Sequence, residues 1–158
     1  MEQLNIPFKA LDTSYGMSSS VIHLTENKRV KYACWLRKSV KNNKVVYAGF
    51  YSSFKPQDKD YEYVKVIFPL PKGNGTVIRK AIIMKDGSIK LVSEGKKFGG
   101  TGYYRLHKNN KGVLKAKMIP IKEVIHVFKD KEGLLRTDHY FKWWNITFLQ
   151  LHYQITLK

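Results

Sequence analysis

The chain has 158 residues, of which 29 are Lys or Arg and 12 are Asp or Glu, so its formal net charge is +17. Hydrophobic residues make up 43% of the chain and include 8 Phe, 10 Tyr and 3 Trp. This composition excludes a disordered basic tail, which lacks the apolar surface needed to form a core. We predict one folded domain over residues 1–158, because a chain of this length buries enough surface to fold without disulfides.

Residues 1–20 are predicted to form an irregular N-terminal arm. Pro7 and Gly16 interrupt any regular pattern there, and three serines follow at 18–20. The first strand is predicted at residues 29–37. Tyr32, Cys34 and Leu36 recur there at every second position, which is the period of a β-strand.

Turn signals then recur at nearly regular spacing along the chain. Asn, Asp and Gly tolerate the positive φ that tight hairpins need. These signals occur at residues 42–43, 73–75, 86–87, 109–112 and 130–133. Short runs rich in β-branched and aromatic residues lie between them, at 45–47, 61–68, 77–84, 89–92, 103–106 and 124–128. Each run has the length of a strand, and the C-terminal segment 147–157 alternates in the same way.

The fold class predicted from this pattern is all-β. We expect an antiparallel meander of roughly nine or ten strands, because no window shows a sustained helical period longer than about 12 residues. A closed lipocalin-like barrel would remove both exposed sheet edges, which otherwise favour aggregation. A two-sheet β-sandwich is the alternative that the same pattern allows.

Cysteine usage and charge indicate the compartment. Cys34 is the one cysteine of the sequence, which excludes an intramolecular disulfide. Glu2 stands where a signal peptide carries Lys or Arg. The longest uncharged stretch, residues 143–157, is too short and too polar to span a bilayer as a helix. We therefore expect a cytoplasmic protein with no membrane partner.

Polar residues inside aromatic strands are the candidate ligand-binding groups. A guanidinium can hold an anionic or carbonyl group, and Arg136 shares a strand face with Asp138, which could orient it. The same two residues could instead form a surface ion pair. The full set of candidate ligand-binding residues is Arg105, Arg136, His126, His152, Tyr103, Tyr104 and Trp143.

Two of these candidates have an ordinary structural interpretation as well. His126 lies in an apolar strand, where a histidine is more often a hydrogen-bonded core residue than a ligand. His152 alternates with apolar residues and is solvated if the apolar face points inward. Glu123 could act as a general base only if burial raised its pKa.

Catalytic, metal and cofactor motifs give weaker signals. No two histidines have the close spacing of a metal site, and Cys34 lies in an apolar strand that would keep its thiol inert. We therefore predict no catalytic residues, no metal and no cofactor. A small enzyme that uses Asp138, Glu123 or a histidine is kept as an alternative.

The net charge favours an anionic partner but does not by itself predict nucleic acid. Five of the 29 basic residues are arginine, which leaves 24 lysines spread over most strands and turns. Recognition of phosphates and bases favours Arg, whereas dispersed Lys also protects sheet edges. Our leading prediction is a non-catalytic β-barrel that binds a small anionic or amphipathic molecule. A nucleic-acid-binding β-sheet module remains the alternative.

Overall fold

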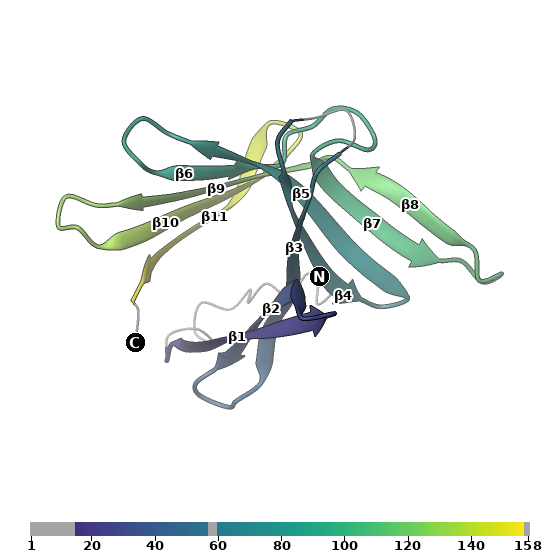
Figure 1. Ribbon diagram of the computed structural model, residues 1–158, viewed down its shortest axis with the longest axis horizontal. Coiled ribbons are helices and arrows are strands. Elements are labelled where there is room, and N and C mark those ends of the chain that lie inside the picture. The colour runs from purple at the N-terminus through teal and green to yellow at the C-terminus, as the bar shows by residue number, and fades with distance from the viewer. Residues whose placement is uncertain (1–14, 57–59, 157–158) are drawn as a thin grey trace. The chain divides into compact units, whose positions relative to one another are not determined.

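The computed structural model describes residues 15–56 and 60–156, in which all regular structure is β (Figure 1). Among these residues, no helix is long and apolar enough to cross a membrane. The eleven strands are β1 (Met17–Glu26), β2 (Arg29–Ser39), β3 (Val45–Phe54), β4 (Tyr63–Leu70), β5 (Gly73–Ile83), β6 (Ile89–Val92), β7 (Gly102–Lys108), β8 (Leu114–Ile119), β9 (Ile121–Lys129), β10 (Leu135–Trp143) and β11 (Ile146–Ile155). The predicted all-β class is confirmed, with slightly more strands than the turn signals indicated.

Hydrogen bonds join the strands in the order β1-β2-β3-β4-β5-β6-β9-β10-β11. Strand β7 pairs with β5 and β8, off this path. The pairing of β6 with β9 is the one step along the path between strands that do not follow each other in sequence, because β7 and β8 lie between them in the chain. Among the described residues, no pairing between β1 and β11 joins the two ends of this path. Closure into a lipocalin-like barrel therefore remains a prediction.

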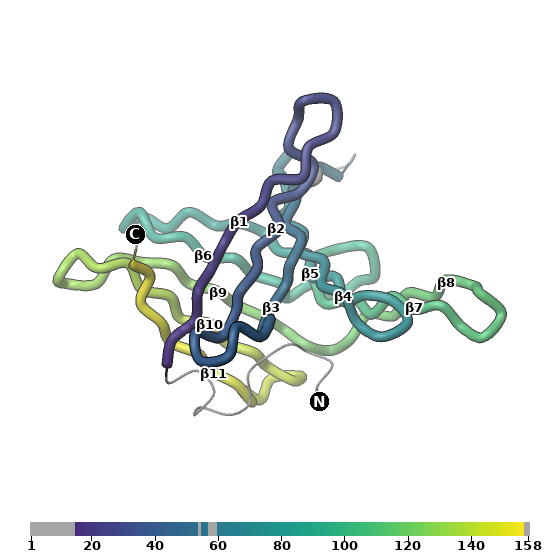
Figure 2. The backbone as a smooth tube through the Cα atoms, turned by 90° about the horizontal axis from the view of Figure 1, so that it is seen from below, coloured from purple at the N-terminus to yellow at the C-terminus, as the bar shows by residue number. Residues whose placement is uncertain are grey.

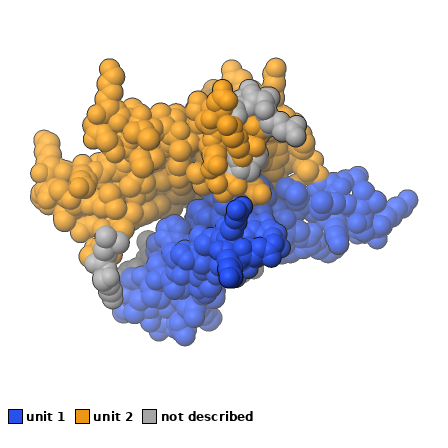
Figure 3. Space-filling model, in the orientation of Figure 1, with its two compact units in different colours: residues 1–52, 66–76, 106–115 blue, residues 53–65, 77–105, 116–158 orange. Residues whose placement is uncertain are grey.

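The chain divides into two compact units, coloured separately in Figure 3. Unit 1 comprises residues 1–52, 66–76 and 106–115, and unit 2 comprises residues 53–65, 77–105 and 116–158. Strands β3, β4, β5, β7 and β8 each contribute residues to both units. The single domain over residues 1–158 remains a prediction.

The predicted irregular arm is wrong for residues 17–20, which begin β1. This strand pairs with β2 from Met17, opposite Ser39, to Glu26, opposite Arg29. Asn27 and Lys28 form the turn between them, and both have positive φ, as in the tightest type of hairpin. The hairpin was missed because the turn has no Gly and β1 is exposed along nearly its whole length, which removes the alternation that predicts a strand. Residues 1–14 of the predicted arm lie outside the described residues.

Strands β2 and β3 of unit 1 carry an aromatic cluster around Trp35. Its ring contacts the rings of Tyr47 and Tyr51, with centroids 6.1 and 6.0 Å away. The guanidinium of Arg37 lies 5.1 Å from the ring centroid of Trp35. Gly49 faces Trp35 across the strands, and a Cβ there would collide with the Tyr47 hydroxyl at 2.4 Å. The glycine therefore makes room for the Tyr47 ring.

Strands β5, β6, β9, β10 and β11 pair antiparallel in unit 2 (Figure 2). Successive side chains of a strand point to opposite sides, and paired residues share a side. We name the two sides by their central acidic residues. The Glu123 face carries Arg79, Leu91, Glu123, Ile125, Thr137, His139, Phe141, Leu151 and Tyr153. The Asp138 face carries Lys90, His126, Arg136, Asp138, Tyr140 and His152.

Candidate functional site

Glu123 is the centre of a buried polar chain in unit 2. Arg79 reaches it from β5, with its Nε donating to Oε2 at 2.8 Å and a terminal guanidinium nitrogen 2.7 Å from the same oxygen. The two side chains are 5% and 4% exposed. An ion pair so completely removed from water is costly unless further hydrogen bonds satisfy both charges.

His139 and Tyr153 extend this chain across the next two strands. The Nε2 of His139 lies 2.6 Å from Oε1 of Glu123, and its Nδ1 lies 3.1 Å from the hydroxyl of Tyr153. When Nε2 carries the proton, the imidazole donates to the carboxylate and the Tyr153 hydroxyl donates to Nδ1. Both ring nitrogens of His139 are thus used inside the chain.

The main chain of Glu123 is held by Ser93, which follows β6. The N–H of Ser93 donates to the carbonyl oxygen of Glu123 at 2.9 Å, and the N–H of Glu123 donates to the Ser93 hydroxyl at 3.1 Å. Ser93 is 1% exposed. The carboxylate therefore projects from a backbone position fixed on both sides.

The pKa of Glu123 is set by opposing effects. Burial alone would raise it, but the positive charge of Arg79 and the hydrogen bond from His139 together outweigh burial and hold the pKa below its usual value. The carboxylate stays ionised and is a weak base. The sequence had left open a general-base role if burial raised this pKa, and the net shift is in the other direction.

Tyr103, from β7, is influenced by the same charges. Burial and then the negative charge of Glu123 raise the pKa of its phenol to about 12, while the positive charge of Arg105 opposes the shift. Tyr103, one of the predicted ligand-binding residues, therefore lies within electrostatic range of Glu123, and a second, Arg105, lies within electrostatic range of Tyr103.

The surroundings of the polar chain are apolar and only half buried. Leu91, Ile125, Phe141 and Leu151 all retain intermediate exposure on the Glu123 face. Thr137 also lies on this face and is 2% exposed, yet its Oγ1 has no hydrogen-bond partner among the described residues. A buried hydroxyl of this kind needs an explanation, because most such groups are satisfied.

The Asp138 face carries three smaller polar pairs. Asp138 accepts from Nδ1 of His152 at 2.5 Å, and Nε2 of His126 lies 2.9 Å from the Ser88 hydroxyl. Arg136 donates from Nε to Asp130 at 2.7 Å. The same-strand ion pair of Arg136 with Asp138 does not form, since each residue has a different partner across a strand or turn.

The seven predicted ligand-binding residues do not converge on one site. His126, Arg136 and His152 lie on the Asp138 face, whereas Tyr103 lies near Glu123 and Arg105 near Tyr103. Trp143 shares the Glu123 face but is exposed at the end of β10, opposite Ile121. The Tyr104 hydroxyl donates to the carbonyl oxygen of Gly100 at 2.8 Å.

Three residues of the buried chain were missed by sequence reasoning: Arg79, His139 and Tyr153. Arg79 did carry a signal, because it is one of only five arginines and lies within an apolar strand. His139 lies on the face opposite Arg136 and Asp138, as its odd spacing from them in β10 requires. Strand register was needed to bring it beside Glu123.

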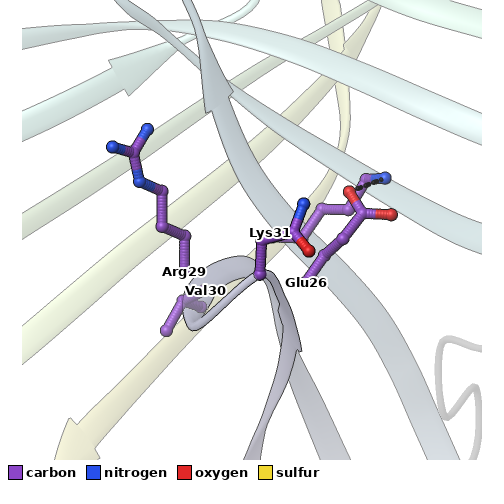
Figure 4. Close-up of a pocket in the computed structure, with 5 residues that line it drawn as sticks. Glu26, Arg29, Val30 and Lys31 are labelled. Carbon is purple, nitrogen blue, oxygen red and sulfur yellow. Dashed lines mark hydrogen bonds and ion pairs between the residues drawn. The ribbon is translucent and has the colours of Figure 1, made fainter.

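The surface of unit 1 has a hollow beside the turn between β1 and β2, of about 510 Å³. In Figure 4, Lys31 reaches the carboxylate of Glu26 while Arg29 points away from this pair. The Lys31 to Glu26 distance is 2.6 Å, but both side chains are more than half exposed. An exposed pair of this type contributes little, so the hollow is a weaker candidate than the Glu123 face.

The described residues give no metal-binding group of three or more His, Cys, Asp or Glu side chains. The aromatic residues of β2 and β3, which could stack on nucleic-acid bases, separate onto two sides of these strands. Tyr32 contacts Phe50 on one side, and Trp35 contacts Tyr47 and Tyr51 on the other. They therefore do not form one continuous stacking platform.

Comparisons with models of protein families, with characterised proteins and with solved structures give no match for this chain. The chemistry of the Glu123 face is therefore the main indication of function.

Proposed function

We propose that the Glu123 face binds a small amphipathic anion and performs no catalysis on it. The observation that carries this proposal is the buried Arg79, Glu123, His139 and Tyr153 chain within a half-exposed apolar face. Apolar walls with a few placed polar groups are the common composition of ligand sites. Apolar residues in these positions would stabilise the fold as well or better, which supports a role beyond stability.

Charge determines the preferred ligand class. The positive charge of Arg79 acts on Glu123, and the charges of Glu123 and Arg105 both act on the Tyr103 phenol, so two positive charges accompany the one negative charge of Glu123. The balance favours an anionic group, such as a carboxylate or a sulfate. An apolar tail would lie against Leu91, Ile125 and Leu151, while the buried Thr137 hydroxyl supplies a donor.

The absence of a free imidazole nitrogen supports binding without catalysis. Glu123 and Tyr153 occupy the two nitrogens of His139. General-base catalysis needs a nitrogen within hydrogen-bond reach of a substrate proton. His139 in this arrangement orders the site and does not exchange protons with a ligand.

The same proposal extends to the setting of the protein. A lipocalin-like closure of the meander would cover the apolar Glu123 face and enclose the ligand. An intracellular location is consistent with the single Cys34 of the sequence. Barrel closure and an intracellular location are both part of the proposal, in which the protein is a carrier or a sensor of a small molecule.

A matched set of dodecyl compounds tests the ligand class. We expect calorimetric titration to detect dodecanoate and dodecyl sulfate, with weaker binding of dodecanol and of dodecyltrimethylammonium. A Thr137→Val variant is expected to weaken dodecanoate binding about fivefold, the value of one hydrogen bond of about 1 kcal/mol. Equal affinity for the cationic compound would overturn the proposal.

The variant Arg136→Gln provides the control for location, because Arg136 lies on the Asp138 face. It is expected to leave dodecanoate affinity unchanged. If Arg136→Gln abolished binding while Thr137→Val had no effect, the ligand would occupy the opposite side of the sheet.

A further inference from the structure

The turn between β10 and β11 presents an exposed apolar surface that the proposed ligand site does not use. Trp143, Trp144, Ile146 and Phe148 are 47%, 68%, 75% and 51% exposed. We call these four residues the tryptophan tip. Trp144 and Asn145 form the two-residue connection between the strands. Contiguous large apolar side chains at the end of a hairpin commonly mark an interaction surface.

Trp144 has a backbone conformation that a tryptophan adopts at a cost. Its φ is +57° at the first central position of the turn, where hairpins usually place Gly, Asn or Asp. Its N–H donates to the carbonyl oxygen of Pro120 at 3.2 Å, and Lys122 donates to the Asn145 side chain at 2.9 Å. Strained backbone conformations of this kind cluster at functional sites, which supports a functional role for the Trp144 side chain.

An apolar cleft adjoins the tip, with a volume of about 380 Å³. Met118, Ile119, Pro120, Ile121 and Trp144 line its apolar part. Lys96 and Lys122 lie at the same cleft, with no acidic residue among its lining residues. The tip and the cleft together present apolar groups bordered by lysine ammonium groups.

The chain segments around the tip and the cleft carry a positive net charge. Residues 95–105, 116–122 and 139–156 contain six Lys or Arg and no Asp or Glu. This net positive charge attracts an anionic surface. A partner that combines negative charge with an apolar layer could contact the basic residues and the apolar tip at the same time.

We propose that the tryptophan tip docks on an anionic lipid surface. Indole rings favour the boundary between headgroups and acyl chains, and nearby Lys residues are attracted to anionic headgroups. Ile146, Met118 and Ile119 favour lipid over a single-stranded nucleic acid, because aliphatic side chains offer no ring for base stacking. This partner differs from the sequence expectation, which was a protein with no membrane partner.

Cosedimentation with vesicles tests the proposal on the full chain. We expect binding to phosphatidylcholine vesicles that contain about one-third phosphatidylserine, and binding at least about tenfold weaker to phosphatidylcholine alone. Tryptophan emission should shift to shorter wavelength on binding. Absence of binding to the anionic vesicles overturns the proposal.

Trp144→Gly separates docking from folding, because glycine suits the positive φ at this position. The variant is expected to be as stable as the wild type but to lose at least about tenfold in vesicle affinity. Ile83→Ala is the matched control, since Ile83 is 80% exposed at the turn after β5. It should bind vesicles like the wild type. Undiminished binding by Trp144→Gly would overturn the proposal.

Two pairs of charge reversals, which lower the net charge by the same amount, test location. Lys96→Glu with Lys97→Glu changes lysines beside the cleft, whereas Lys85→Glu with Lys131→Glu changes exposed lysines at turns on the opposite end of the strands. The first pair is expected to weaken binding at least about tenfold, and the second pair much less. Equal losses would show a nonspecific effect of net charge and overturn the docking site. Binding of a single-stranded oligonucleotide, but not of vesicles, that is lost in Trp144→Gly would assign the tip to nucleic acid instead.

Discussion

The two faces of the β9 and β10 pair are built from alternate residues of the same strands, yet their charged side chains differ in burial. On the Glu123 face, the carboxylate and its Arg79 partner are almost fully buried and linked to His139. On the Asp138 face, Asp138 pairs with a His152 side chain that is 54% exposed. Residue types are similar on both faces. Because the Glu123 pair is removed from water, breaking it should lower the free energy of unfolding strongly. Breaking the exposed Asp138 pair should lower it only slightly, although the residue types are alike.

Removing one buried charge should produce the largest difference in stability between variants of the two faces. Glu123→Gln keeps the side-chain shape but leaves Arg79 buried without its counterion, and is expected to lower the free energy of unfolding by about 3–5 kcal/mol. Asp138→Asn should lower it by less than about 1 kcal/mol. Urea denaturation of both variants measures the difference, and equal losses would contradict the contrast.

A double variant shows whether charge or side-chain packing is responsible. Arg79→Met combined with Glu123→Leu replaces both ions by apolar groups of similar size, and is expected to recover most of the stability that Glu123→Gln loses. A loss in the double variant as large as in the single one would point to packing.

The pH dependence of stability should differ between the faces as well. Because the folded pKa of Glu123 is below its ordinary value of 4.5, the carboxylate contributes stability above this pH, and the contribution disappears as the pH falls through the folded pKa. The unfolding free energy of Glu123→Gln should therefore fall less steeply with acidification than that of the wild type. The hydrogen bond from Arg136 also lowers the pKa of Asp130, but this pair is more exposed, so Asp130→Asn should change the slope less. Parallel curves for Glu123→Gln and wild type would contradict the assignment.

Much of the fold was predictable because its causes are local. The Asp86-Gly87 and Asp130 to Gly133 signals mark real turns, with positive φ at Gly87 and Gly133. Alternation along β2 and β11 was read from residue type alone. The hairpin of β1 and β2 was not predicted, because Asn27 and Lys28 supply its turn without glycine and the strand has no buried face.

The candidate site was less predictable because it depends on register between distant strands. Arg79 and Glu123 are 44 residues apart in sequence, and the pairing of β6 with β9 across an intervening hairpin brings them together. Composition identified Arg as informative but could not choose Arg79 over Arg136. The sequence also could not show that Asp130, and not Asp138, would be the partner of Arg136.

Loss of one neutral hydrogen bond should separate the faces by a smaller amount. Tyr153→Phe removes the hydroxyl that contacts His139 and is expected to cost about 1 kcal/mol, because a buried imidazole nitrogen loses its partner. Tyr140→Phe removes a hydroxyl on the other face, near Asp138, where water can replace its interactions, and should cost only a few tenths of a kcal/mol. Thermal denaturation of the two variants makes the comparison, and a larger cost for Tyr140→Phe would reverse it.

The smallest effect is expected at Thr137, and its sign is opposite to the others. Thr137 Oγ1 is buried on the Glu123 face without a hydrogen-bond partner among the described residues, so the folded protein carries the cost of removing it from water. Thr137→Val has nearly the same shape and should raise the free energy of unfolding by up to about 1 kcal/mol. Thr147→Val, at an exposed position of β11, should change it by less than about 0.5 kcal/mol. A gain in stability together with weaker dodecanoate binding would identify the hydroxyl as one kept for its ligand, since stabilising substitutions at functional positions commonly reduce function. A gain in stability with unchanged binding would leave the contrast between the faces intact but remove Thr137 from the ligand site.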